Sequence, residues 1–67
     1  MRSANLSEAK LRKANLQGAI LYNANLHGAN LADADLTGAI LNGAILKGAK
    51  YTEEQINSAK SSKDIKR

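Results

Sequence analysis

Apolar residues recur in this chain at every fifth position. An alanine stands two residues before each apolar centre, and all five glycines stand two residues after one. The pattern continues without a gap over residues 4–53, so the sequence contains ten copies of one five-residue unit. The centres, which we predict to form the structural core, are nine leucines and a tyrosine: Leu6, Leu11, Leu16, Leu21, Leu26, Leu31, Leu36, Leu41, Leu46 and Tyr51.

A period of five fits neither a long helix nor a long strand. In a helix, successive leucines would advance by about 140° beyond a full turn and would define no apolar face. In a strand, an odd period would send them to opposite faces. We therefore predict short extended pieces joined by turns, in which the alanine and leucine of each unit point inward. The glycines fit turns that require a positive φ.

The most regular units share a motif, which reads Ala4-Asn5-Leu6, Ala14-Asn15-Leu16 and Ala34-Asp35-Leu36. This motif resembles the A-(N/D)-L-x-x signature of the pentapeptide-repeat family. The resemblance covers all ten units, although five of them carry Lys or Ile just before the centre. It implies an all-β solenoid, a right-handed quadrilateral β-helix with four units in each coil. Ten units then make about two and a half coils, and residues twenty apart stack at about 4.8 Å.

The two ends of this solenoid differ. Thr52-Glu53-Glu54-Gln55 is a capping-box pattern, which predicts a short helix that lays Ile56 and Ala59 over the last coil. The first three residues are too short to cover the other end. The first coil either binds a partner, which would be a second copy of the chain or another protein, or it remains an uncovered end that is frayed but soluble. The predicted division is a lead-in at 1–3, the repeat domain at 4–52, a capping helix at 53–60 and a flexible basic tail at 61–67.

The amino-acid composition restricts which bonds and sites the chain can form and where in the cell we expect it. The chain has no cysteine, so it can form no disulfide and no cysteine-based zinc site. Its longest apolar run covers only residues 19–22, far short of the roughly 20 residues of a membrane span. Residues 1–13 contain no apolar signal-peptide core. We therefore expect no transmembrane segment and a cytoplasmic location.

The outward positions of the repeat carry the candidate sites. Ile20 and Ile40 are predicted to stack on one face, with Tyr22 beside them and Ile45 at the start of the adjoining face. This apolar corner is either a docking strip for another protein or a ladder that stabilises stacked strands. The outward asparagines form either a ligand-binding ladder or amide hydrogen bonds between coils.

The sequence offers no catalytic or metal constellation. His27 is the only histidine, and the residues expected above and below it in the stack are Lys47 and Ser7. Asp33 and Asp35 fall on other faces, and a filled rod has no cleft that excludes water. We therefore predict a non-enzymatic protein with no metal, cofactor or small-molecule substrate.

Charge leaves two classes of function open. The net charge is +4, but residues 4–53 hold five basic and four acidic residues. Some members of the family are acidic rods that mimic DNA and bind gyrase. The repeat domain of this chain is short and nearly neutral, so we do not expect it to have that role. The favoured prediction is a protein-interaction or assembly module. The alternative is an interactor of nucleic acid or of a DNA-handling enzyme through the basic tail, whose residues would otherwise only aid solubility: Lys60, Lys63, Lys66 and Arg67.

Overall fold

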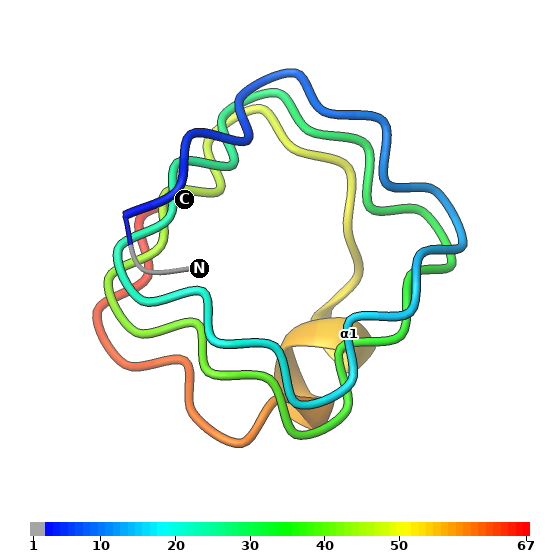
Figure 1. Ribbon diagram of the computed structural model, residues 1–67, viewed down its shortest axis with the longest axis vertical. Coiled ribbons are helices and arrows are strands. Elements are labelled where there is room, and N and C mark those ends of the chain that lie inside the picture. The colour runs from blue at the N-terminus through cyan, green and yellow to red at the C-terminus, as the bar shows by residue number, and fades with distance from the viewer. Residues whose placement is uncertain (1–2) are drawn as a thin grey trace.

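The computed structural model describes residues 3–67. The chain winds around a central axis, and the view down that axis shows successive turns lying over one another in a roughly four-sided ring (Figure 1). Its helix, α1, spans Glu53–Ser58. Elsewhere in the described residues, the backbone pairs through isolated parallel bridges rather than through long strands.

Residues twenty apart pair on each side of the ring. Asn5 pairs with Asn25, and Asn25 in turn pairs with Ile45. The other sides are joined in the same way by Lys10 with Asn30, Asn15 with Asp35, and Ile20 with Ile40. This is the register that four five-residue units per circuit require, so each side of the ring is a stack of short parallel pieces.

The interior is filled by leucine and alanine. Six leucines from Leu21 to Leu46 are at most 1% exposed, and alanines pack between them. Alanine suits these positions because a larger side chain would crowd an interior in which each coil lies about 4.8 Å from the next. Three of the four leucines of the first coil are different, because Leu6, Leu11 and Leu16 are only partly buried.

Every turn places one residue in the left-handed region of the backbone. All five glycines have φ between 69° and 75° there, as the turn prediction requires. Residues with side chains occupy the same position of other units, including Glu8 and Lys13 with φ of 62°. The backbone geometry of the repeat therefore imposes this conformation whether or not glycine is present, although it costs other residues about 1 kcal/mol.

The helix α1 begins at the predicted residue and ends at Ser58, two residues before the predicted end. Thr52 is its N-cap and forms a complete capping box with Gln55. Ile56 is 3% exposed and belongs to the core, while Ala59 packs beside it. The helix therefore lies on one side of the ring, at its lower right, with Ile56 packed into the core (Figure 1).

Gln55 also replaces a missing piece of backbone. In the preceding coils, the Asp35 N–H donates to the Ala14 carbonyl at 2.9 Å. The same register would make the backbone N–H of residue 55 donate to Ala34. Instead, the Gln55 side-chain amide donates to the carbonyls of Ala34 at 3.0 Å and Leu31 at 2.6 Å. The side chain thus satisfies a carbonyl that the interrupted repeat leaves behind.

The segment after the helix differs from its prediction as a flexible tail. Ser61 pairs with Ile40, and Lys66 pairs with Ile45, so this segment rejoins the coil (Figure 1). The Leu41 N–H donates to the Ser61 carbonyl at 2.7 Å, and the Lys66 N–H donates to Ala44 at 2.8 Å. Backbone bonding to the coil below holds the segment, although it contains no in-phase leucine. The partner is now twenty-one residues away instead of twenty, because the six residues of α1 replace one five-residue unit.

Candidate functional site

The apolar corner predicted from the sequence lies on the outside of the ring. Ile20 pairs with Ile40 and is 48% exposed, the highest exposure of any large apolar residue among those described. Ile40, Ile45 and Tyr22 are half-buried. The next layer on the sides that carry Ile40 and Ile45 belongs to the segment 61–67. Its residues Ser61, Lys63 and Lys66 border the apolar patch there. The structure therefore places these apolar residues next to the charged residues of the segment 61–67.

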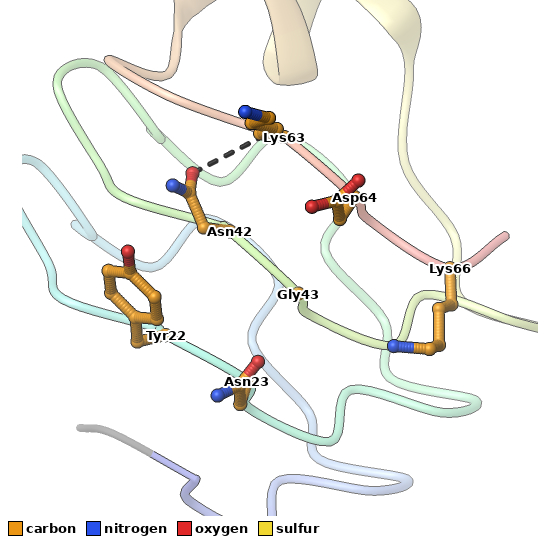
Figure 2. A pocket seen from close by; sticks show the side chains of 7 residues that line it. All are labelled: Tyr22, Asn23, Asn42, Gly43, Lys63, Asp64 and Lys66. Atoms are coloured by element: carbon orange, nitrogen blue, oxygen red, sulfur yellow. Dashed lines mark hydrogen bonds between the residues drawn. The ribbon is translucent and has the colours of Figure 1, made fainter.

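A cavity lies where the segment 61–67 rejoins the coil. It has a volume of about 500 Å³ and opens to solvent. Tyr22 stands at one side of it, with Lys63 and Lys66 on the strand opposite (Figure 2). The two groups of residues that the sequence suggested as separate sites therefore meet at one place on the surface. The complete lining is Tyr22, Asn23, Asn42, Gly43, Lys63, Asp64 and Lys66.

Sequence reasoning missed four of these lining residues. Asn42 accepts a hydrogen bond from the Lys63 N–H at 3.3 Å, which joins the two layers (Figure 2). The Asn23 side chain fills the space beside Gly43, because a Cβ built on Gly43 would lie 2.0 Å from Asn23 Oδ1. Asp64 has a positive φ, and aspartate is a residue type typical of such turns, so its identity is the local signal in the sequence. That signal marks the rejoining segment but gives no partner for it.

The outward asparagines bond locally rather than between coils. The side-chain oxygens of Asn15, Asn25 and Asn30 each accept the backbone N–H two residues ahead, at 3.0 to 3.1 Å. These contacts are Asx turns, which stabilise the corner of each unit. The sequence expectation of amide bonds linking successive coils is therefore wrong for these three residues. Their side-chain oxygens therefore stabilise the turns of the fold itself.

Asp35 receives hydrogen bonds from two neighbours. Its carboxylate accepts the Thr37 hydroxyl at 2.6 Å, the Thr37 N–H at 3.0 Å and the Gln17 amide in the coil below. These bonds stabilise the ionised form, so the pKa of Asp35 is lowered, with the Thr37 hydroxyl as the main cause and Gln17 next. Asp35 thus links two coils on the side where α1 replaces the third layer.

This arrangement predicts a dependence of stability on acid. A carboxyl whose pKa is lower when folded contributes stability above its ordinary value of 3.8, and this contribution disappears as the pH falls further. We expect Asp35→Asn to lose less stability than the wild type between pH 7 and pH 3, because it keeps an acceptor for Thr37 without the charge. Urea unfolding of both proteins at each pH measures the difference. An equal loss in both would contradict a role for this carboxylate.

His27 has an acidic neighbour that the sequence stack did not predict. Its Nδ1 lies 3.7 Å from Glu8 Oε2, and both side chains are more than half exposed. Glu8 reaches this place because Gly28, the next residue after His27, has no side chain to obstruct it. One histidine and one carboxylate are too few ligands for a metal site. Residues 3–67 contain no group of three or more potential metal ligands.

The four basic residues named in the sequence have different surroundings. Arg67 forms an ion pair with Glu53 at the start of α1, and this contact raises the pKa of Arg67. The pair joins the end of the chain to the helix. Lys63 and Lys66 are exposed at the cavity, and Lys60 is exposed at the end of α1. The structure therefore spreads these cations over a folded surface instead of collecting them on a mobile arm.

No helix in the described part of the chain is long and apolar enough to cross a lipid bilayer. No curated protein matches the sequence. Among solved structures, the pentapeptide repeat protein Rfr23 from the cyanobacterium Cyanothece 51142 is 41% identical, with a TM-score of 0.66. That match covers 98% of this chain but only 45% of Rfr23, so the chain spans less than half of this relative.

A second pentapeptide repeat protein, from the thylakoid lumen of Arabidopsis thaliana, is 21% identical over 96% of this chain and 58% of its own length, with a TM-score of 0.37. The family model for pentapeptide repeats matches eight copies, over residues 1–38 and 29–50. Together with the twenty-residue pairing of the coils, this match shows that the chain belongs to the pentapeptide repeat family, and membership of that family implies the fold of a right-handed quadrilateral β-helix.

Proposed function

We propose that this chain is a protein-interaction or assembly module that docks through its first coil and through the isoleucine corner. One observation carries the proposal, which is the unequal covering of its apolar groups. The core beneath α1 is buried, whereas Leu6, Leu11 and Leu16 are only partly buried at the other end. Ile20, in the same first coil, is 48% exposed. Apolar surface gathered in one part of a small protein is typical of an interaction site.

We also infer that the protein has no enzymatic activity of its own. Pentapeptide repeat proteins are generally structural or interaction modules. The ten repeats would form about two and a half coils closed by α1, and leucine and alanine fill their interior. The cavity at Tyr22 is open to solvent, and it offers no buried acid–base pair among its lining residues.

The isoleucine corner is tested by polar substitution. The double variant Ile20→Ser/Ile40→Ser is expected to lose the partners that the wild-type chain captures from a native lysate, because the apolar contact is removed. Lys50→Ser is the matched control, since Lys50 occupies the same outward position of its unit on another side. Circular dichroism must show that both variants keep the fold. If the double variant captures the same proteins as the control, the corner is only a structural ladder.

The alternative partner is nucleic acid or a DNA-handling enzyme, bound through Lys60, Lys63 and Lys66. Contacts between these cations and phosphates release counterions, so binding would weaken steeply as the salt concentration rises. Apolar docking at the isoleucine corner would be nearly insensitive to salt. A salt titration of the captured complex therefore separates the two functions.

A further inference from the structure

The first coil presents backbone groups that have partners in every later coil. In the second coil, the Asn25 N–H donates to the Ala4 carbonyl at 2.8 Å, and the Asn25 carbonyl accepts from the Leu6 N–H at 2.7 Å. Both polar groups of the residue just before each centre therefore point toward the N-terminal end of the solenoid. The corresponding residues of the first coil form neither of these bonds with any described residue: Asn5, Lys10, Asn15 and Ile20.

This arrangement makes the edge complementary to itself. In an antiparallel pair, two opposed residues exchange both of their backbone hydrogen bonds. A second copy, rotated by a two-fold axis perpendicular to the coil axis, would run antiparallel to the first on all four sides. We propose that two copies of this chain stack head to head through their first coils; this inference rests on the proposed interaction function and names the occupant of one of its two surfaces.

The same contact would bury the exposed leucines. Leu6, Leu11 and Leu16 of one copy would face those of the other across the junction, and would gain the cover that the later leucines receive from neighbouring coils. The chain measures 23 × 21 Å across the coil axis. The pair would therefore bury about 1,000 Å² in total, at the lower limit for specific interfaces, so the dimer is expected to be weak.

The opposite end favours this geometry over head-to-tail stacking. There, Ile56 and Ile65 pack on the core, and the Gln55 side chain occupies the Ala34 carbonyl that a further coil would need. A first coil could dock at that end only by displacing α1. Head-to-head stacking instead uses the same surface on both copies, and it closes after two chains rather than growing into a fibre.

Charge predicts how the dimer responds to salt. The described part of the first coil carries Lys10, Arg12 and Lys13 against one carboxylate, Glu8. Two such coils facing each other repel, so added salt should strengthen dimerisation by screening this repulsion. An acidic protein docked on the same coil would show the opposite response and would bind less tightly as salt rises.

Sedimentation velocity over a concentration series tests the proposal, with two substitutions at one edge residue. Lys10→Pro removes an N–H that is unbonded in the monomer, and proline is tolerated on such edges. We expect it to raise the dimer dissociation constant at least tenfold, because bonds are lost on both copies. Lys10→Ala keeps the N–H and removes a charge, so it should dimerise at least as tightly as the wild type.

A distance measurement gives an independent test that does not depend on the proline variant folding. The chain has no cysteine, so Ser7→Cys in the first coil and Ser58→Cys in α1 each provide a single position for a spin label. Head-to-head stacking predicts a shorter distance between labels at residue 7 than between labels at residue 58. A monomer at all concentrations, or a shorter distance at residue 58, would overturn the inference. The isoleucine experiment tests the proposed function separately.

Discussion

Replacing Leu26 by alanine is expected to lower the free energy of unfolding by about 3 kcal/mol. Leu26 is fully buried, with a leucine of the same column in the coil on each side, Leu6 below and Leu46 above. The truncation would leave a cavity that the stacked backbone cannot collapse to fill, since the coils are held at strand spacing by hydrogen bonds. Urea unfolding followed by circular dichroism measures the loss.

Leu6→Ala is the matched control for this prediction, because it makes the same chemical change in the same column at the open end. Leu6 is partly exposed and has a leucine on one side only, so we expect a loss of about 1 kcal/mol. The comparison requires concentrations below the dimerisation range, because a second copy would bury Leu6. Equal losses in the two variants of the monomer would contradict the idea that the first coil is uncovered.

Gln55→Glu is expected to destabilise the fold by about 2 kcal/mol at neutral pH. The substitution retains an oxygen that can accept the Thr52 N–H, as the glutamine does at 2.7 Å. It removes the amide donor and brings a carboxylate toward the carbonyls of Leu31 and Ala34. The loss therefore isolates the contact between α1 and the coil from the capping box itself.

Acid provides the internal check on this second prediction. A protonated glutamate can donate one hydrogen bond, so the difference in stability between Gln55→Glu and the wild type should narrow as the pH falls below about 4. Gln55→Ala, which neither donates nor ionises, should show no such narrowing. If the two variants respond to acid alike, the carbonyls of Leu31 and Ala34 are satisfied by other donors.

The sequence predicts this molecule best where one rule repeats. The spacing of five, with alanine two residues before each leucine, forces a chain that turns regularly and hides one side of each unit. The pairing of Asn5 with Asn25, and of Asn25 with Ile45, follows from that rule together with the four-unit circuit of the family. The start of α1 was also predictable, because the capping box of Thr52 and Gln55 is a local pattern.

The rest depends on contacts that have no local signature. The segment 61–67 lacks a leucine in phase with the repeat, so its composition resembles that of a mobile tail. In the structure, however, the Leu41 N–H and the Ala44 carbonyl form hydrogen bonds with its backbone. Gln55 illustrates the same limit, because its partners at Leu31 and Ala34 are more than twenty residues away. The cavity beside Tyr22 exists only because this segment returns, so the sequence pattern could not reveal it.

The position of α1 constrains how such a chain can change length. The helix lies above the side formed by Asn15 and Asp35, and Gln55 bonds to the carbonyls of Leu31 and Ala34 beneath it. Inserting one repeat would move the helix by a quarter turn to a neighbouring side. Segment 61–67 would then pack against different residues of the coil. Insertion of four repeats at once would return the helix to the same side, so variants that keep the side-chain contacts of segment 61–67, such as that of Asn42 with Lys63, should differ in length by whole multiples of twenty residues.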